Sequence, residues 1–539
     1  MLGNFLDGNR EASAVSEKNH TDRFGNDESC NPDMNAAEES DRPIVPEKAV
    51  NEAQAEEPLE GRGRTKENTM ESHTGSTPSE QTVLTGLQRV RRTAKEDKHV
   101  RFTALLHHMT VDLLRESFLS LKRKAAPGID GQTWEQYEQN VEERLINLHG
   151  RVHRGAYRAQ PSRRVYLEKP DGRKRPLGIA VLEDKIVQGA VVKILEAIYE
   201  EDFLGFSYGF RPERGAHDAL DALSVALQFE KVDWVLDADI QSFFDTMSHE
   251  WTMKFLQHRI ADPRILRLIR KWLRAGVSED GEWSSTTIGT PQGAVISPLL
   301  ANVYLHYALD LWARQWRRTT AGEMFIVRYA DDVIFAFQDQ SEAKRFRVAL
   351  AERLRQFGLE LHPQKTRLIE FGRFAEDHRR DRGQGPPETF DFMGLTHICG
   401  RDRKGKFQVQ RRTIAKRMRA RLAFLKLELR KRRHDRVRET GQWLRSVVTG
   451  YYRYHAVPGN LNMLFRFRCR LARLWRQALL RRGGKRQLSW ERFLPLLDRW
   501  VPLPTVQHPY PNIRFAVKYP RWEPYAGKPL VRFCPGGAS

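Results

Sequence analysis

The sequence is poor in cysteine and has no long apolar run. Its 4 cysteines lie far apart, with no CxxC pair and no metal-ligand spacing: Cys30, Cys399, Cys469 and Cys534. This pattern argues against a zinc site and against a disulfide framework. No apolar stretch approaches the roughly 18–20 residues of a membrane span. The N-terminus also lacks the basic and apolar regions of a signal peptide. We therefore expect a cytoplasmic protein with no membrane partner.

What the chain does have is positive charge, and that charge is unevenly distributed. The formal net charge is +21 over 539 residues. Residues 1–60 run against this trend, with 15 Asp or Glu and 5 Lys or Arg. Clustered Lys and Arg favour a polyanionic partner, because they release counterions from a phosphate backbone. The alternative is a basic protein whose charges are simply solvated.

The first 80 residues are rich in Glu, Asp, Asn, Ser and Gly and show almost no apolar periodicity. Such a segment buries too little apolar surface to offset the entropy of ordering. We therefore predict a disordered acidic N-terminal segment over residues 1–80, followed by the folded part of the chain.

Strand patterns predict a mixed α+β domain after this segment. "RRVYLEKPDGRKRPLGIAV" is typical of a β-hairpin that turns at Pro170-Asp171-Gly172. "WVLDADI" and "MFIVRYADDVIFAF" are short apolar runs that carry acidic residues. Two such strands can bring their acids to one place in an α+β domain.

The chain becomes strongly basic and helical after about residue 400. Residues 401–440 hold 17 Lys or Arg against 4 Asp or Glu. "RRTIAKRMRARLAFLKLELRKRR" predicts a long helix whose apolar stripe packs while its other faces meet solvent or phosphate. The stripe consists of Ile414, Met418, Leu422, Leu425 and Leu429.

The adjacent acids Asp331 and Asp332 give the strongest local signal for chemistry. They lie in Tyr329-Ala330-Asp331-Asp332, between two apolar strand segments. Carboxylates held together repel each other and lose solvation, and a divalent cation such as Mg²⁺ relieves both effects. A plain hairpin turn is the alternative, since Asp is common in turns.

A second group of acids, Asp237, Asp239 and Asp245, lies in "VLDADIQSFFDTMSH". Asp237 and Asp239 share one face of the predicted strand, and Asp239 lies where that strand ends. Asp245 is expected to cap the following helix. A phosphoryl-transfer site with two metal ions needs such convergent carboxylates.

The order of motifs resembles that of bacterial group II intron-encoded reverse transcriptases, the intron maturases, from about residue 95 to 480. The motifs in order are "KAAPGIDG", "LEKPDGRKRPLGIAVLEDKIVQGAV", "SYGFRPERGAHDAL", "DADIQSFFDTMSH", "GTPQGAVISPLLANVYLHYALD", "RYADD", "GLELHPQKTRLI", "FDFMGLTH" and "WLRSVVTGYYRYH". The resemblance implies a right-hand polymerase. Fingers and palm would lie in residues 81–400, an α-helical thumb or maturase domain X in 401–480, and a DNA-contacting segment in 481–539.

The resemblance also assigns roles to single residues. Asp239, Asp331 and Asp332 would be the catalytic carboxylates, which bind two Mg²⁺ ions with Mn²⁺ as a possible substitute. Phe244 would exclude the 2′-hydroxyl of a ribonucleotide, although a core phenylalanine is the alternative. Gln292 would contact the incoming nucleotide. The triphosphate would be held by Arg175, Lys169 and Lys365, of which both lysines could instead be ordinary surface residues.

Aromatic and basic residues in the last third are the candidates for RNA binding. Tyr451, Tyr452 and Arg453 could stack on or contact RNA, or could simply pack in a helical domain. Arg417 and Arg421 lie on the predicted basic helix. The implied partners are group II intron RNA, target DNA and dNTPs, possibly with a homodimer, in a nucleoid-associated ribonucleoprotein.

The sequence departs from the family pattern in a few places, among them His362 where an Asn is usual. Ala294 follows "PQG" where a second glycine is usual, and residues 485–539 show no Cys/His-rich endonuclease cluster. Three alternatives to an intron-encoded polymerase remain. They are a splicing factor with an idle polymerase site, a domesticated reverse transcriptase in defence or repair, and an RNA-dependent RNA polymerase. The three acids at 239, 331 and 332 argue against the first.

Overall fold

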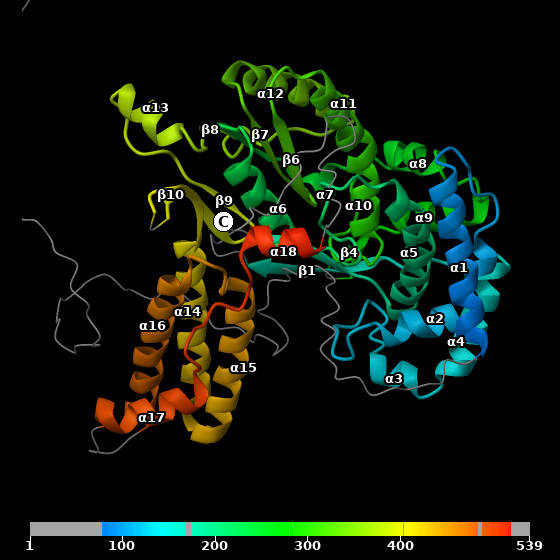
Figure 1. Cartoon of the computed structure of the whole chain (residues 1–539). Coiled ribbons are helices and arrows are strands. Elements are labelled where there is room, and N and C mark those ends of the chain that lie inside the picture. Colours follow the sequence, from blue (N-terminus) through cyan, green and yellow to red (C-terminus); the bar gives the residue numbers. More distant parts are fainter. Residues whose placement is uncertain (1–77, 169–173, 280, 403, 483–487, 519–539) are drawn as a thin grey trace, which may run out of the picture. The chain divides into compact units, whose positions relative to one another are not determined.

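The computed structural model of the chain describes residues 78–168, 174–279, 281–402, 404–482 and 488–518. All of these belong to one compact unit, Val50–Ser539 (Figure 1). Nearly all of the predicted acidic segment, residues 1–80, lies outside the described residues, and so does Lys169. Within the described part of the chain, every helix is too short or too polar to cross a lipid bilayer.

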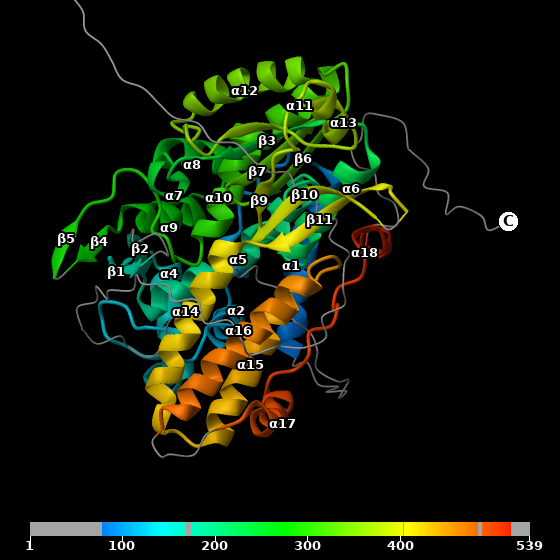
Figure 2. The same cartoon turned by 90° about the vertical axis from the view of Figure 1, so that its left-hand side faces the viewer.

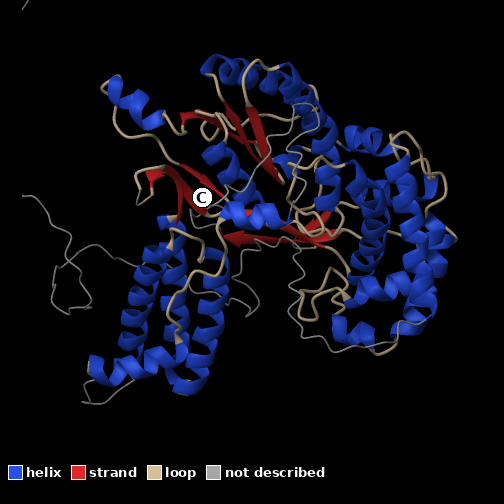
Figure 3. Ribbon diagram, in the orientation of Figure 1, coloured by secondary structure: helices blue, strands red, loops and turns tan. Residues whose placement is uncertain are grey.

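Helices build the first part of the described chain, and Figure 3 shows them in blue. Helix α5 lies at their centre, because both α1 and α2 pack against it. Its length and its many fully buried aliphatic side chains suit this position. The elements are α1 (Pro78–Glu96), η1 (Leu106–His108), α2 (Val111–Leu119), α3 (Trp134–Glu138), α4 (Val141–His153) and α5 (Leu182–Asp202).

The predicted hairpin forms a small sheet with the strand order β2-β1-β4-β5. β1 (Ser162–Glu168) and β2 (Lys174–Ile179) are antiparallel, and Val165 pairs with Leu177. β1 also pairs in parallel with β4 (Val277–Glu279), which continues antiparallel into β5 (Glu282–Ser284).

A four-stranded antiparallel sheet with the order β6-β7-β3-β8 carries the acidic residues. Its strands are β3 (Trp234–Asp239), β6 (Met324–Tyr329), β7 (Asp332–Phe337) and β8 (Arg367–Glu370). The side chains of β3 alternate between two hydrophobic cores. Leu236 belongs to the core that includes α12, and Val235 belongs to the core that includes α6. Period-two alternation therefore puts Asp237 and Asp239 on the α6 side of the sheet.

Helices cover both faces of this sheet and connect its strands. α12 contacts β3 and β7 on one side, and α6 contacts β6 on the other. α10, η2 and α11 follow one another directly, and η2 is a π-helical turn. The bounds are α6 (Ala216–Phe229), α7 (Phe243–Thr246), α8 (His249–Gln257), α9 (Pro263–Arg274), α10 (Ser297–Leu305), η2 (His306–Asp310), α11 (Leu311–Thr319), α12 (Gln340–Arg355) and α13 (Ala375–Asp381).

The cap expected from Asp245 is not formed by that residue. Asp245 lies inside the short helix α7, whereas the side chain of Ser248 accepts the hydrogen bond from the Trp251 amide at the start of α8. The prediction failed because a one-turn helix comes between the strand and α8.

A third sheet spans the domain boundary expected at residue 400. Its order is β11-β10-β9, and its strands are β9 (Phe390–Phe392), β10 (Leu395–Arg401) and β11 (Phe407–Thr413). The predicted basic helix consequently begins at Ala415, four residues later than the pattern suggested. The first residues of that pattern are used as a strand instead.

The helices from α14 to α17 form a helical bundle, which we call the C-terminal bundle (Figure 2). It consists of α14 (Ala415–Lys431), η3 (Arg432–His434), α15 (Val437–His455), α16 (Leu461–Leu480) and α17 (Trp490–Trp500). The predicted stripe of α14 is confirmed for four of its residues, which are buried in the bundle core: Met418, Leu422, Leu425 and Leu429. After α17 the chain returns to the sheet domain, where α18 (Pro511–Lys518) packs against α6.

Candidate active site

The structure brings Asp239, Asp331 and Asp332 together at one end of the central sheet. β3 and β7 run antiparallel, and Asp239 is the register partner of Asp332. Asp331 lies in the two-residue turn between β6 and β7, next to Ala330, whose φ angle is 55°. A positive φ is uncommon for alanine, so this turn needs support from its surroundings.

The carboxylates of this turn are held in surroundings that disfavour their charge. Burial, followed by repulsion from Asp331, Asp239 and Asp237, raises the pKa of Asp332 to about 7. The side chain of Asp332 still reaches solvent at the sheet end, so we regard repulsion as an essential part of this rise. Burial also raises the pKa of Asp331, while Arg175 and Lys365 offset part of that rise.

Lys365 lies on the Asp239 carboxylate. Its Nζ donates a hydrogen bond to Asp239 Oδ2 over 2.8 Å, between groups that are 51% and 26% exposed. The loop that carries Lys365 is fixed by its backbone, because the His362 amide donates to the Asp239 carbonyl over 2.8 Å. Lys365 was expected to approach a triphosphate. In the structure it contacts the Asp239 carboxylate.

Asp237 lies on the same face of β3 as Asp239 and has an ion pair of its own. Burial raises the pKa of Asp237 to about 6, and Arg367 on β8 lies 3.8 Å from its carboxylate. The structure therefore gives Asp237 a cationic partner of its own, Arg367.

Gln292 and Arg175 come from neighbouring segments that are joined by their backbones. The Gly178 amide on β2 donates to the Gln292 carbonyl over 2.7 Å. A Cβ on Gly178 would lie 2.9 Å from Pro291 Cβ, so the two segments are in close contact. Arg175 is exposed near the start of β2 and influences the pKa of Asp331.

Phe244 is only half-buried, whereas its neighbour Phe243 is buried in the main core. Ser242, just before them, has a φ angle of 47°, which starts α7. The Phe244 carbonyl accepts a hydrogen bond from the Thr290 amide over 2.8 Å. Phe244 therefore adjoins the segment that contains Gln292, and its half-buried ring also packs against the main core, in which Phe243 is fully buried.

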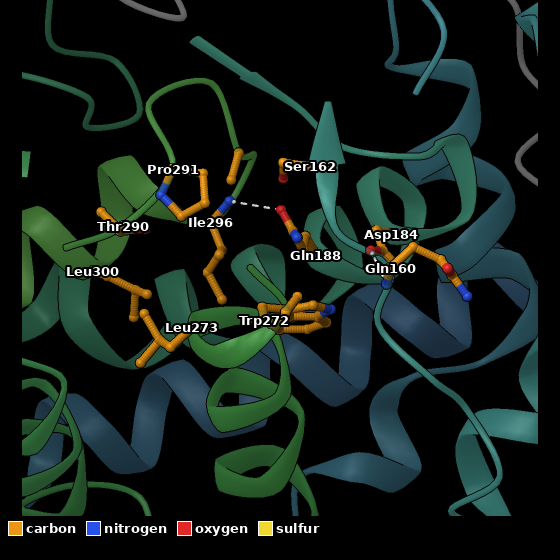
Figure 4. Close-up of a pocket in the computed structure, with 12 residues that line it drawn as sticks. Gln160, Ser162, Asp184, Gln188, Trp272, Leu273, Thr290, Pro291, Ile296 and Leu300 are labelled. Atoms are coloured by element: carbon orange, nitrogen blue, oxygen red, sulfur yellow. Dashed lines mark hydrogen bonds between the residues drawn. The ribbon is translucent and has the colours of Figure 1, made fainter. Parts of the chain in front are cut away.

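The segment around Gln292 is supported from behind by polar residues that line a small cavity (Figure 4). The Gln188 side-chain oxygen accepts a hydrogen bond from the Ile296 amide over 3.4 Å, and Asp184 accepts one from the Gln160 amide over 3.0 Å. The cavity measures about 10 Å³, which leaves room for one water molecule at most. The cavity is therefore too small to hold a nucleotide. The hydrogen bond to Gln188 supports the segment.

The expected RNA-binding residues differ in how far they are exposed. Arg417 and Arg453 are exposed, whereas Arg421 is half-buried with its guanidinium 5.2 Å from the Phe424 ring. Tyr451 stacks on Phe467, with ring centroids 4.1 Å apart.

Tyr452 requires a correction, because it is 1% exposed in the core of the C-terminal bundle, where its ring cannot stack on a base. The signal that we missed is the four-residue spacing of Leu444, Val448 and Tyr452, which places all three on the packed face of α15.

Arg417 also has a position that the sequence did not suggest. A Cβ on Gly394, directly before β10, would lie 3.4 Å from Arg417 Nη1. The charge of Arg417 lowers the pKa of Asp332, against the larger effects of burial and repulsion. The first turn of α14 therefore lies within electrostatic reach of the acidic residues.

The donor set fits a hard divalent cation. Asp239, Asp331 and Asp332 offer only carboxylate oxygens, which such cations prefer, and their repulsion is of the kind that a cation relieves. In the part of the chain that the structure describes, no three acidic, His or Cys side chains are already arranged as a ligand set. One of the oxygen donors, Asp239 Oδ2, accepts a hydrogen bond from the Lys365 ammonium.

Comparisons with known proteins find similarity in the part of the chain that carries these acidic residues. Residues 167–397 match the family described as "Reverse transcriptase (RNA-dependent DNA polymerase)". Protein YkfC of Escherichia coli (strain K12) is 37% identical over 232 residues, which cover 42% of this chain and 61% of that protein. The group II intron-encoded protein LtrA of Lactococcus lactis subsp. cremoris is 35% identical over 222 residues, which cover 41% of this chain and 37% of LtrA.

A more distant relative is the nuclear intron maturase 2, mitochondrial, of Arabidopsis thaliana. It is 27% identical over 233 residues, which cover 36% of this chain and 30% of that protein. The chain thus spans less than two thirds of the length of each of these relatives. The matched residues 167–397 contain Asp239, Asp331 and Asp332 as well as the strands that carry them. Over residues 167–397 the chain is accordingly similar to reverse transcriptases, among them group II intron-encoded proteins.

Proposed function

We propose that the chain is an RNA-directed DNA polymerase that adds deoxynucleotides to a primer 3′-hydroxyl. Its template would be the RNA of a group II intron, which it would also help to splice. The observation that carries the proposal is the register pair Asp239–Asp332 beside Asp331, inside the matched reverse transcriptase region.

The three carboxylates would hold two Mg²⁺ ions, or Mn²⁺ in their place. When bound, such ions lower the pKa of an attacking hydroxyl and stabilise a leaving pyrophosphate. Asp332, whose pKa of about 7 keeps it partly protonated at neutral pH, would lose its proton on binding a cation. Lys365 would neutralise the Asp239 carboxylate whenever no metal ion is bound there.

The nucleotide would lie against residues from four segments of the chain. Phe244 would place its half-buried ring against the sugar, where a ribose 2′-hydroxyl would clash. Gln292, fixed to β2 through its carbonyl, would contact the incoming nucleotide. Arg175 would pair with the triphosphate, because a guanidinium fork suits phosphate geometry, and Lys365 would assist it. Lys169 would belong to the same group.

The C-terminal bundle would act as thumb and maturase domain by binding nucleic acid. Supporting this role, the exposed side chains of α14 include Lys416, Arg417, Arg419, Lys426 and Arg430, opposite its buried stripe. Arg421 and Arg453 would add to this surface. Intron RNA and target DNA are the proposed partners, since phosphate contacts supply most of the affinity for nucleic acids.

Primer extension on an RNA template with a DNA primer tests the proposal. We expect the full chain to extend the primer with dNTPs in Mg²⁺, and Asp332→Asn to lose at least about 10³-fold in rate, a loss typical of removing a principal catalytic group. Asp339→Asn is the matched control, because Asp339 is exposed just beyond the other end of β7. Absence of extension by the wild type, or an unchanged rate in Asp332→Asn, contradicts the proposal.

The choice of sugar is tested by Phe244→Ala in the same assay. We expect the variant to accept rNTPs more readily while retaining dNTP addition, because the ring no longer blocks the 2′-hydroxyl. A wild type that prefers rNTPs would instead indicate an RNA polymerase. A chain that aids splicing but never extends a primer would be a splicing factor with an idle site. Flanking DNA without group II RNA domains would favour a domesticated enzyme.

A further inference from the structure

A fully buried ion pair lies directly behind the turn that carries Asp331 and Asp332. Arg328 on β6 is 0% exposed, and Asp310, at the end of the π-helical turn η2, is 1% exposed. The pair is bidentate: Arg328 Nε donates to Asp310 Oδ1 over 2.8 Å, and Nη2 donates to Oδ2 over 2.6 Å. Asp310 thereby fixes the plane of the guanidinium.

The remaining arm of this guanidinium reaches the turn. Arg328 Nη1 donates to the carbonyl of Ala330 and to Asn302 Oδ1, each over 3.0 Å. Ala330 is the residue with a positive φ angle, directly before Asp331. The contact therefore restrains the peptide group that joins Ala330 to the first acidic residue.

A second contact, through Asn302 and Gly209, also supports the turn. Asn302 Nδ2 donates to the Gly209 carbonyl over 2.8 Å. A Cβ on Gly209 would lie only 2.3 Å from the Ala330 nitrogen, so the Gly209 backbone is packed directly on the turn. The backbone on either side is paired as well, because the Tyr208 amide donates to the Arg328 carbonyl over 2.8 Å.

Stability alone does not explain this arrangement. A buried ion pair pays a desolvation cost that its attraction often only balances, and apolar side chains of similar volume can be as stable. A π-helical turn is also uncommon and occurs frequently at functional sites. Here that turn ends on Asp310, and the hydrogen bonds lead from there to the strained residue before Asp331.

We infer that Arg328 and Asn302, oriented by Asp310, are positioning residues that hold the Ala330 turn so that Asp331 and Asp332 face Asp239 in the geometry of the polymerase reaction. None of the three touches the reacting atoms in this scheme. Their action passes through the Ala330 and Gly209 carbonyls. The catalytic part of this inference rests on the proposed polymerase function.

The test replaces Arg328 by lysine in the full chain. Arg328→Lys keeps the positive charge beside Asp310 but cannot reach Asp310, Asn302 and the Ala330 carbonyl together, because lysine has no planar fork. We expect kcat for dNTP addition to fall by on the order of 10²-fold, the scale of a misplaced catalytic group. The KM for dNTP and the affinity for primer–template should stay within about threefold, since substrate contacts are unchanged.

Arg259→Lys is the matched control. Arg259 is also buried, at 3%, and its Nε lies 2.9 Å from Asp202. Its guanidinium donates to the carbonyls of Ala94, Asp97 and Val100, and none of these belongs to the turn. We expect a similar fall in thermal stability with kcat nearly unchanged. Equal losses of kcat in the two variants, or no loss in Arg328→Lys, would overturn the inference.

Hydrogen exchange in the metal-free protein separates this inference from the proposed function. We expect the amides of residues 329–333 to exchange faster in Arg328→Lys than in the wild type, but not in Arg259→Lys. Faster exchange in a protein that never extends a primer would support the positioning role and reject the polymerase. Unchanged exchange would reject the positioning role. If Arg328→Lys does not fold, Asn302→Leu is used instead, because it removes both hydrogen bonds of the amide at similar volume.

Discussion

Asp310 and the pair Asp331–Asp332 are acidic residues in two different environments of the same fold. Asp310 is enclosed and meets the guanidinium of Arg328 through two hydrogen bonds. Asp331 and Asp332 lie at the sheet end, and within the described residues neither forms an ion pair. Burial raises the pKa of all three carboxyls, but for Asp310 the Arg328 charge offsets it inside the protein.

The difference indicates where the protein leaves charge for something else to balance. A buried carboxylate that is paired with its own cation has its charge balanced inside the protein. Clustered carboxylates without such a partner repel one another, and their charged form is disfavoured until a ligand balances it. The Arg328 network ends on the turn of the second group. The compensated acid therefore supports the uncompensated ones, and each of the following experiments tests one side of this contrast.

The largest expected effect comes from breaking the compensated pair. Arg328→Met leaves the Asp310 carboxylate buried without its main cation, so we expect the free energy of unfolding to fall by about 3–5 kcal/mol. Arg328→Met/Asp310→Leu removes both charges and should recover part of that loss. Urea unfolding monitored by circular dichroism measures both variants. A double variant no more stable than the single one would mean that the pair is not the unit described here.

A smaller effect of opposite sign is expected at the uncompensated acids. Asp332→Asn removes repulsion and should raise the stability of the metal-free protein by about 1 kcal/mol, a modest value because the side chain reaches solvent. The pKa of Asp332 is raised from 3.8 to about 7 by folding, so the folded protein binds more protons between these values. Stability of the wild type therefore falls as pH rises through that window.

Thermal unfolding at pH 5 and pH 8 checks this sign. The advantage of Asp332→Asn should be greater at pH 8 than at pH 5. Mg²⁺ should narrow the gap at pH 8, because a cation bound only by the folded wild type stabilises it. An advantage that does not change with pH would show that repulsion at Asp332 is not its cause.

The smallest expected effect on stability concerns Lys365, which lies between the two extremes. Its ion pair with Asp239 is partly exposed, so Lys365→Met should cost no more than about 1 kcal/mol. If Lys365 also binds the triphosphate, the KM for dNTP should rise in the same variant. Lys344→Met, on the exposed surface of α12, is the control for loss of a lysine. An unchanged KM would restrict Lys365 to its contact with Asp239.

Much of the site follows from short-range patterns in the sequence. Two apolar runs around Asp331 and Asp332 predicted a hairpin, and the alternation of β3 predicted that Asp237 and Asp239 share a face. The stripe from Met418 to Leu429 predicted the packed face of α14. These patterns are reliable because each depends only on the period of one strand or one helix.

Other features were mispredicted or missed because they depend on neighbours distant in sequence. The pattern around residue 411 favours a helix, yet Phe407–Thr413 pairs with β10 as a strand. Tyr452 looked like part of an RNA-binding cluster, but its side chain fills the core formed by α14, α15 and α16. In both cases packing against another element outweighed the local preference.

The sequence by itself determined which residues are the candidates for the chemistry. The acids, the hairpin that carries two of them, Phe244 and the basic helix are all visible in it. Only the tertiary structure decided which charges are compensated. Lys365 forms an ion pair with Asp239, which lies 126 positions earlier in the sequence. Arg328 forms one with Asp310, at the end of a π-helical turn that no local sequence pattern predicted. The physical reason is that a carboxyl's pKa and the shape of a turn depend on what folding brings within a few ångströms, and that distance is not encoded in any short segment.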